Sequence, residues 1–300
     1  MPAVSIVIAT FNRGDYLGAT LDSIFTQTFR DFEVIVVDDG STDDTRRVID
    51  AFGSRVRYVY QDNRGPSAAR NLGVRHANAE WISIQDSDDL CLPNHLHDLH
   101  DYAAHHPEVG MVFANGNYLE GPAHNRGTII PDAKSRRLAS RPVQLEDIFE
   151  KSIVRLQASL IAKKCYDEIG GHNEDLWICM DLDLAFRLWV RYPMAYLNKV
   201  VFSYRKHPGN ISSDQERRLS ENLQVIENLL GDFSEAEQIL GRRRIGARLA
   251  YRYYRLAKTQ MKKGKVADAR KSLRAAVDLS SINPKYRLYQ LQWAAMKPRG

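Results

Sequence analysis

The sequence predicts an α/β fold, in which a mostly parallel sheet is flanked by helices and followed by an α-helical C-terminal extension. Runs of β-branched residues, VSIVI at 4–8 and EVIVV at 33–37, are typical of strands buried in a parallel sheet. Segments with helical spacing of apolar residues alternate with these runs, and this alternation implies crossovers between parallel strands. The pattern of residues 215–300 is strongly helical.

The expected elements follow one another in a regular order. Residues 15–27 place apolar side chains at helical spacing and predict the first helix. Ser41 or Thr42 is suited to cap a second helix after the strand at 33–37. The next expected elements are a strand at 57–60, a helix from Pro66, a strand at 81–85, a helix from Pro93 and a strand at 109–113. Residues 115–150 have weak periodicity and predict loops and short strands over a crevice at the strand ends.

Charge is distributed unevenly along the chain, whose net charge is +5. Residues 1–100 contain 9 Lys and Arg against 15 Asp and Glu, which gives −6. Residues 215–300 contain 19 against 8, which gives +11. An acidic front part and a basic tail indicate two separate roles.

Composition and short motifs exclude several protein classes. Three cysteines are too few for a disulfide framework, and no Cys-x-x-Cys pair indicates a zinc or redox site. No run of eighteen apolar residues predicts a membrane span, and the first apolar run is too short for a signal peptide. No G-x-G-x-x-G follows the first strand, which excludes a nicotinamide dehydrogenase. We expect a cytoplasmic protein, with the inner face of the membrane as a peripheral location.

Pairs of carboxylates follow two of the predicted strands. Asp38 and Asp39 end one strand, and Asp86 and Asp88 follow another. Ligands of open α/β sheets bind outside the carboxyl ends of the strands, so we expect these two pairs to converge on one crevice. Three neighbouring carboxylates are interpreted as helix caps: Asp43, Asp44 and Asp89.

The carboxylates of Asp86 and Asp88 suit a hard cation. Mn²⁺ and Mg²⁺ commonly bind through one or two carboxylates together with substrate phosphates. A D-x-D pair is by itself a weak signal, because acidic pairs are common at turns. The metal would stabilise a diphosphate leaving group.

Five motifs in one order carry a family resemblance: PAVSIVIATFNR, VIVVDDGSTDDT, NRGPSAARNLGVRHA, QDSDD and GGHNEDLWICMDLDLAFRL. From residue 3 to about 212 the chain resembles family 2 glycosyltransferases, which are inverting enzymes of the GT-A fold. The resemblance implies a catalytic domain at 1–214, with a nucleotide-sugar half at 1–114 and an acceptor half at 115–214. Residues 215–300 then form the helical extension.

The resemblance also implies roles for individual residues. The nucleotide-sugar site is assigned to Thr10, Phe11, Asn12, Asp39, Arg70 and Asp86. A carboxylate at Asp39 accepts hydrogen bonds only, so it suits the imide N–H of uracil and predicts a UDP-sugar donor. The metal is assigned to Asp88, with Asp86 and His207. The alternatives are a core position for Phe11, a surface helix position for Arg70 and a solvated loop for His207.

The acceptor hydroxyl needs a general base, and Asp181 matches the family position. The usual Glu before this Asp is replaced by Met180, which puts the acceptor preference in doubt. Asp183 is expected to brace the following helix. Glu174, in an earlier acidic pair, is the competing candidate for the base.

Other features stand outside these motifs. Five histidines at 95–106 are interpreted as solvated: His95, His97, His100, His105 and His106. Residues 249–284 resemble a single tetratricopeptide-type hairpin, with Gly264 at its turn and Pro284 at its end. Six arginines between 242 and 255 suit an anionic membrane face or only brace the enzyme.

The sequence therefore predicts a metal-dependent inverting glycosyltransferase. The expected acceptor is a glycan or lipid-linked hydroxyl, in bacterial surface polysaccharide synthesis. The C-terminal helices are expected to contact a membrane or a second copy of the chain, and no nucleic-acid module accompanies the basic charge. Two alternatives remain open at this point: a non-catalytic sugar-nucleotide-binding module and a metal-dependent phosphohydrolase.

Overall fold

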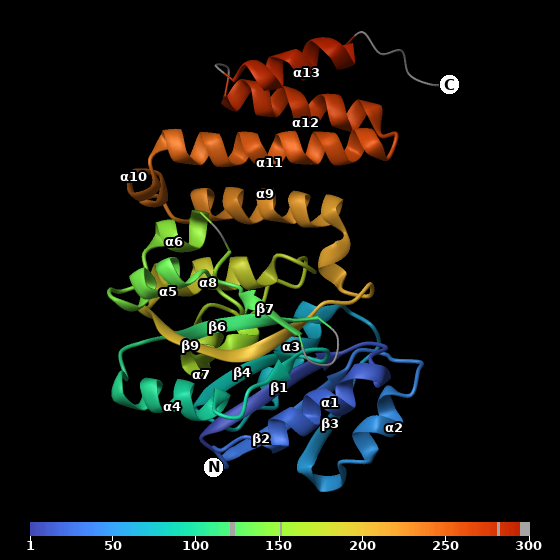
Figure 1. Ribbon diagram of the computed structural model, residues 1–300, viewed down its shortest axis with the longest axis vertical. Helices are drawn as coiled ribbons and strands as arrows, with labels where there is room; N and C mark the ends of the chain where they lie inside the picture. Colours follow the sequence, from blue (N-terminus) through green and yellow to red (C-terminus); the bar gives the residue numbers. More distant parts are fainter. Residues whose placement is uncertain (121–123, 151, 281–282, 295–300) are drawn as a thin grey trace. The chain divides into compact units, whose positions relative to one another are not determined.

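A computed structural model describes residues 1–120, 124–150, 152–280 and 283–294 (Figure 1). The chain forms two compact units, Met1–Pro208 and Gly209–Gly300. The first is a mixed α/β unit with the GT-A type of arrangement, and the second is helical. Within the described residues, no helix combines the length and apolarity needed to cross a bilayer.

The sheet of the first unit has the strand order β3-β2-β1-β4-β8-β6-β9-β5, with β7 paired to β6. Its strands are β1 (Val4–Thr10), β2 (Phe32–Asp38), β3 (Val56–Tyr60), β4 (Trp81–Asp86), β5 (Leu90–Cys91), β6 (Met111–Glu120), β7 (His124–Thr128), β8 (Ser159–Ala162) and β9 (Met194–Arg205). The sheet is mostly parallel, because its longer ladders, β1–β2, β1–β4, β2–β3 and β6–β9, are all parallel.

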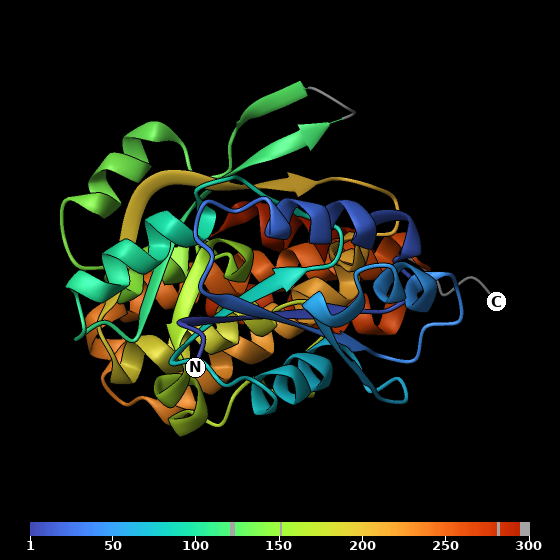
Figure 2. The same ribbon diagram turned by 90° about the horizontal axis from the view of Figure 1, so that it is seen from below.

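Helices lie on both faces of the sheet, as the predicted crossovers require. The helices of this unit are α1 (Gly14–Phe25), α2 (Thr45–Asp50), α3 (Pro66–Arg75), α4 (His95–His105), α5 (Asp132–Ala139), α6 (Leu145–Glu150), α7 (Lys163–Glu168) and α8 (Met180–Arg191). Figure 2 shows α1 and α3 on opposite faces of the β1–β4 strands. The predicted strands and the helix from Pro66 are confirmed.

Helix α3 lies unusually close to the sheet. Its Gly73 faces Val7 and Val37, and a Cβ at this position would collide with the Val7 side chain. Pro66 occupies the first helical turn, and Gly65 precedes it with φ of +91°, a conformation that favours glycine. This tight docking fixes the depth at which Arg70 and its neighbours reach the strand ends.

For residues 115–150 the expected strands are present, whereas the expectation of loops for the rest is wrong in part. Strand β6 continues to Glu120, β7 pairs with it, and α5 and α6 follow, while residues 121–123 lie outside the described part. Both helices are short, and α5 buries only Ser135 and Leu138, so neither leaves a clear periodic pattern in the sequence.

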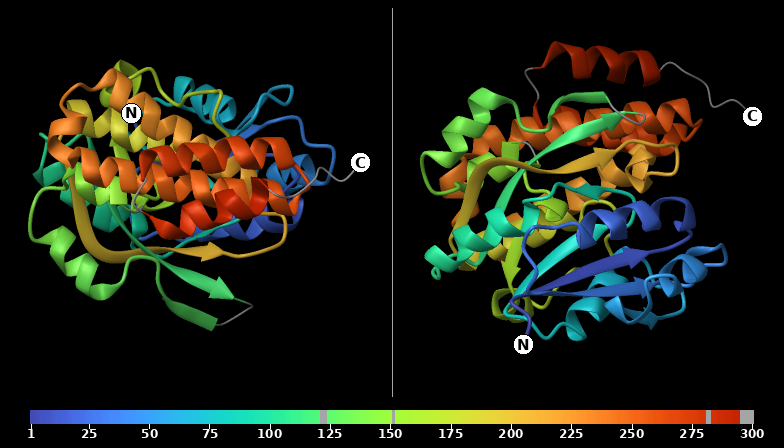
Figure 3. Two further views of the ribbon diagram at one scale, coloured as in Figure 1. Left: turned by 90° about the horizontal axis from the view of Figure 1, so that it is seen from above. Right: turned by 60° about the horizontal axis from the view of Figure 1, so that its bottom comes forward.

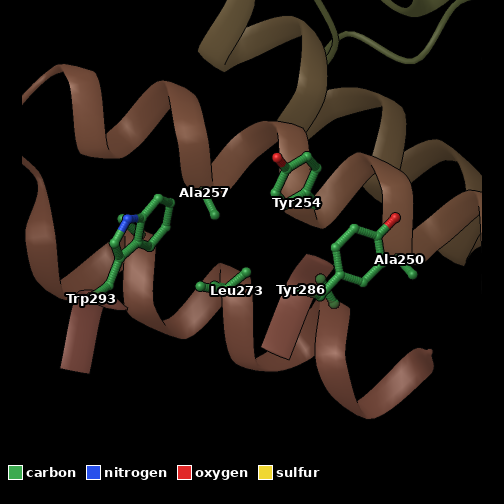
Figure 4. Close-up of a cluster of buried hydrophobic side chains, with 8 residues drawn as sticks. Ala250, Tyr254, Ala257, Leu273, Tyr286 and Trp293 are labelled. Atoms are coloured by element: carbon green, nitrogen blue, oxygen red, sulfur yellow. The ribbon is translucent and has the colours of Figure 1, made fainter. Parts of the chain in front are cut away.

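The second unit consists of α9 (Gln215–Asp232), α10 (Ala236–Leu240), α11 (Arg242–Lys262), α12 (Val266–Leu279) and α13 (Pro284–Ala294) (Figure 3). Asp214 caps α9 by accepting hydrogen bonds from the backbone of Glu216 and Arg217. A turn at Gly264, with φ of +77°, joins α11 to α12. Figure 4 shows the core of this unit, formed by small residues and aromatic rings: Ala250, Tyr254, Ala257, Leu273, Tyr286 and Trp293.

The solvated interpretation of His95 is wrong, whereas His97 and His105 are exposed as expected. His95 is fully buried, and its Nδ1 donates to the carbonyl oxygen of Val201 at 3.1 Å. Because Nδ1 carries the proton, Nε2 accepts from Gln85 Nε2 at 3.2 Å. Burial lowers the pKa of His95 to about 4, since a buried imidazolium loses its hydration.

This buried imidazole makes the stability of the protein depend on pH. The folded pKa lies below the ordinary value of 6.5, so the unfolded chain binds more protons and stability falls as the pH drops from 6.5 toward 4. Urea unfolding at pH 7.5 and pH 5 should show a loss for the wild type about 2 kcal/mol larger than for His95→Gln. His97→Gln is the control and should lose as much as the wild type. Equal pH dependence in all three proteins would contradict the prediction.

Candidate functional site

The carboxyl ends of β1, β2 and β4 meet at one edge of the sheet. Ala9 is paired with Asp86 across the β1–β4 ladder, and Thr10 with Asp38 across the β1–β2 ladder. The backbone amide of Asp39 donates to the Thr10 carbonyl at 2.8 Å. The two acidic pairs expected to converge therefore end β2 and β4, the two strands that flank β1.

Three carboxylates, Asp86, Asp88 and Asp89, have oxygens within 4.8 Å of one another. Among the described residues they form the one group of three or more acidic, His or Cys side chains arranged to hold a metal. Burial raises the pKa of Asp88, and the charge of Asp86 raises it further. Burial and the charges of both neighbours raise the pKa of Asp89 well above its usual value. Neighbouring negative charge therefore disfavours the ionised forms of Asp88 and Asp89.

His207 and Arg13 lie beside this cluster. His207 Nε2 is 2.8 Å from Asp88 Oδ2, and Arg13 Nε is 3.7 Å from the same oxygen. The imidazole is stacked on Tyr16, with the ring centroids 4.4 Å apart, and its side chain is only 7% exposed. The alternative of a solvated loop histidine is therefore wrong.

The capping interpretation holds for one of its three carboxylates. Asp43 accepts from the backbone of Gly14 and Thr45, the first residues of α1 and α2. Asp44 makes no capping bond and pairs with Arg47 at 2.9 Å. Asp89 is buried, and its Oδ1 accepts from the Arg205 amide at 2.8 Å. Asp89 is therefore part of the acidic cluster and not a cap.

Arg70 connects this cluster to the predicted base. Its Nη2 is 2.6 Å from Asp86 Oδ1, and its Nη1 is 3.5 Å from Asp181 Oδ1. Nη1 also lies 2.6 Å from the sulfur of Met180, the residue that stands in place of the usual Glu. The side chain is 7% exposed, so the surface-helix alternative is wrong. Two strong ion-pair partners keep this buried guanidinium charged.

Asp181 lies in the first turn of α8, with its side chain 18% exposed. Burial raises its pKa, Arg70 opposes the rise and the charge of Asp86 adds to it. Asp183 instead accepts from both Nε and Nη2 of Arg187 within α8, as expected of a bracing residue. A raised pKa suits a carboxylate that must take a proton near neutral pH.

Glu174, the competing candidate, has a different environment. Its side chain is 40% exposed and is held by Arg64 at 3.1 Å and by Asn71 at 3.0 Å. Asn71 also donates to the His172 carbonyl, so these contacts dock the loop before α8 onto α3. The contacts of Glu174 are those of a residue that positions a loop.

Two of the residues expected to hold the nucleotide organise the loops at this edge. Asp39 is buried and accepts from Gln61 Nε2 and from the amides of Arg64 and Gly65. Asn12, with φ of +50°, accepts from the Thr42 amide at 2.8 Å.

Phe11, which is also assigned to the nucleotide, is 44% exposed, so the alternative of a core position is wrong. Thr10, which is also assigned to the nucleotide, is buried. The positions of all four are compatible with a nucleotide pocket, and their roles remain predictions.

Several buried polar atoms at this edge have no hydrogen-bond partner among the described residues: Thr10 Oγ1, Arg70 Nε, Asp89 Oδ2 and Gln157 Oε1. Buried polar atoms in folded proteins are nearly always paired, so their concentration here marks a site that binds a polar ligand. The bare Asp89 oxygen beside two further carboxylates suits a divalent cation such as Mn²⁺ or Mg²⁺. The residues present therefore fit the expected metal.

Two residues of the site were missed by the sequence analysis. Asp89 belongs to the QDSDD motif, so its proximity to Asp86 and Asp88 was the available signal. Gln157 is 5% exposed and donates from Nε2 to Asp86 Oδ2. No motif surrounds Gln157, and its place depends on how β8 pairs with β4.

The fold and these carboxylates define a GT-A glycosyltransferase. The profile of "Glycosyl transferase family 2" matches residues 5–161. Glycosyltransferase GlyG of Streptococcus pneumoniae is 41% identical over 219 residues, which are 69% of this chain and 72% of GlyG. The chain belongs to glycosyl transferase family 2 and is a glycosyltransferase.

Two solved structures share the fold. S. aureus TarS 1–349 in complex with UDP-GlcNAc has a TM-score of 0.63 at 17% identity, covering 97% of this chain and 91% of that one. The mannosyltransferase PcManGT of Pyrobaculum calidifontis in complex with GDP-Man and Mn²⁺ has a TM-score of 0.62 at 18% identity, covering 98% and 84%. The two relatives carry different nucleotides, so the fold alone does not select the donor.

Proposed function

We propose that the protein is an inverting transferase that moves a sugar from a nucleotide-diphosphate donor, UDP-linked by preference, to a hydroxyl of a glycan or lipid-linked acceptor. The observation that carries the proposal is the ion pairing of Arg70 with both Asp86 and Asp181. One guanidinium separates a carboxylate of the donor site from a carboxylate suited to act as a base. This spacing allows an acceptor hydroxyl at the base to attack a sugar bound in the donor site.

In this proposal Asp181 removes the proton of the acceptor hydroxyl as that oxygen attacks C1 of the sugar. The diphosphate leaves from the opposite side, so the configuration at C1 is inverted. A Mn²⁺ or Mg²⁺ ion, when bound, would neutralise the diphosphate. Asp88, Asp86 and His207 would hold this ion, with Asp89 contributing its free oxygen. Arg70 supports the site by balancing the charges of Asp86 and Asp181.

The preference for UDP rests on Asp39. Three donors from the loop between β3 and α3, on Gln61, Arg64 and Gly65, hold the carboxylate in one orientation. A carboxylate offers about four lone pairs, so it keeps capacity for one more N–H donor. The imide of uracil supplies such a donor, and Phe11, exposed at the end of β1, supplies an adjacent aromatic face.

We assign donor binding to residues 1–114, acceptor binding to 115–214 and a separate role to the helical extension at 215–300. In that extension Arg242, Arg243 and Arg244 are exposed, whereas Arg248 and Arg252 are half-buried. The exposed cluster suits an anionic membrane face that carries a lipid-linked acceptor of bacterial surface polysaccharide synthesis. A tetratricopeptide-like hairpin at α11–α12 that contacts a second copy is the other role consistent with this surface.

The two alternatives from the sequence are less suited to this site. A phosphohydrolase with clustered carboxylates is expected to have several histidines among its ligands, and His207 is the one histidine that contacts the acidic cluster among the described residues. A non-catalytic binding module has no need of a carboxylate such as Asp181, held opposite Asp86 by Arg70.

A panel of UDP-, GDP- and dTDP-sugars, each with Mn²⁺ and simple sugar acceptors, tests the proposal. We expect transfer or slow hydrolysis with a UDP-sugar, and an anomeric proton of inverted configuration in the NMR spectrum of the product. Strong preference for a GDP-sugar would overturn the uracil role of Asp39. A product of retained configuration would overturn the proposed mechanism.

A further inference from the structure

We propose that Gln157 recognises the sugar of the donor, because its side-chain oxygen is placed to accept a hydrogen bond from a hydroxyl or amide N–H of the transferred sugar. This inference rests on the proposed function, since it assigns part of the same donor site.

The position of Gln157 follows from the pairing of two strands. Strands β4 and β8 are antiparallel, with Trp81 opposite Ala162 and Ile82 opposite Ile161. Continuing this register to the end of β4 puts position 157 opposite Asp86. Gln157 lies there in a short 3₁₀ turn, Leu156–Ala158, directly before β8.

The orientation of the Gln157 amide is fixed by Asp86. A carboxylate only accepts hydrogen bonds, so the nitrogen of the amide must face it and the oxygen must face away. That oxygen, Gln157 Oε1, is buried and has no partner among the described residues. Leaving a buried acceptor unpaired is unfavourable, and a ligand donor would recover that loss.

The main chain of this turn is fixed by a hydrogen bond from the side chain of Gln85. The carbonyl of Gln157 accepts from Gln85 Nε2 at 3.1 Å, and Gln85 also contacts the buried His95. A backbone fixed in this way presents the amide oxygen in one place. Gln157 therefore resembles a preorganised contact more than a mobile surface side chain.

The same turn reaches the base, which identifies the sugar as the occupant. The Leu156 amide lies near enough to the Asp181 carboxylate to oppose the rise of its pKa, so the turn extends from Asp86 toward Asp181. The transferred sugar must lie between the leaving diphosphate and the base. Gln157 donates through its nitrogen to Asp86, one of the proposed cation ligands, so its oxygen faces away from that carboxylate. A sugar hydroxyl supplies the donor that the amide oxygen lacks.

The experiment compares Gln157→Met with Gln27→Met. Methionine keeps the length of the side chain but removes both polar atoms, and Gln27 is a buried glutamine that donates to the carbonyls of Ser23 and Leu92 and is not a residue of the site. Affinities for UDP and UDP-GlcNAc, and for GDP and GDP-mannose, are measured by calorimetry with Mn²⁺ present. The quantity of interest is the ratio of the affinity for the nucleotide sugar to that for its nucleotide, which cancels effects shared through Asp86.

We expect Gln157→Met to lower this ratio about tenfold for the nucleotide pair that the wild type binds, and Gln27→Met to leave it unchanged. Gln157→Asn, which keeps the amide but shortens its reach, guards against a folding defect and should lower the ratio as well. An unchanged ratio in folded Gln157 variants overturns the inference alone. If the folded wild type binds none of the four compounds, the proposed function itself fails and the inference with it.

Discussion

Asp181→Asn is expected to lower kcat by roughly 10²- to 10⁴-fold, while the affinity for the donor stays near that of the wild type. The amide has nearly the shape of the carboxylate but takes no proton at neutral pH. Arg70 keeps its stronger ion pair with Asp86 at 2.6 Å, so the donor side of the site is retained. Steady-state transfer assays combined with calorimetric donor binding measure the two quantities separately.

Glu174→Gln is the matched control, because it neutralises a second acidic residue, in the loop that leads into α8. Its exposed carboxylate contacts Arg64 and Asn71, so we expect only a small change in transfer. Full activity of Asp181→Asn with a large loss in Glu174→Gln would move the base to the earlier acidic pair.

The pH profile gives a further readout of the same prediction. Burial raises the pKa of Asp181, so the acid limb of kcat/KM should lie above the ordinary range of a carboxyl group. Activity is present above this pKa and is lost as the pH falls through it, because the protonated group accepts no proton. The residual activity of Asp181→Asn should lack this limb.

Asp88→Ala is expected to reduce both donor affinity and turnover by at least about 100-fold, since the charge of the diphosphate loses several kcal/mol of compensation. EDTA should have the same effect on the wild type. Asp44→Ala serves as the control, because this exposed carboxylate pairs with Arg47 outside the cluster. Undiminished UDP binding in EDTA, together with full activity of Asp88→Ala, would contradict the prediction.

Thermal unfolding separates a ligand role of Asp88 from a structural one. In the metal-free protein, burial and Asp86 raise the pKa of Asp88, so its ionised form is unfavourable in the fold at neutral pH. Removing this charge should leave Tm unchanged or higher without metal. A large fall in Tm would instead indicate that Asp88 is needed for folding.

The central fold was predictable because its strands are short apolar runs that end in turn residues. Strand β4 and the helix from Pro66 begin where the sequence indicates. The solvated interpretation of His95 overlooked the periodicity of α4. His95, Leu99 and Ala103 follow one another at intervals of four residues, so their spacing indicates that they share the buried face of the helix. The number of histidines does not distinguish the buried one from the exposed ones, whereas their positions along the helix do.

Residues of the site that lie in sequence motifs were predictable, whereas the residue placed by strand pairing was not. Asp88 and Asp181 were assigned from motifs. Gln157 reaches Asp86 because β8 pairs antiparallel with β4. The sequence predicts parallel strands joined by crossovers, and this prediction gives no register for an antiparallel pair. Long-range antiparallel pairing leaves no local pattern in the sequence, so such residues become visible only in the structure.

Arg70 shares one positive charge between Asp86 and Asp181, and this sharing has a thermodynamic consequence. A ligand at Asp86 that changes the ion pair between Asp86 and the Arg70 guanidinium also changes the proton affinity of Asp181. By reciprocity, protonation of Asp181 alters the affinity at Asp86 by the same factor. In the proposed mechanism, donor binding and protonation of the base are therefore linked equilibria, and a titration of either one in the presence of the other reports their coupling free energy.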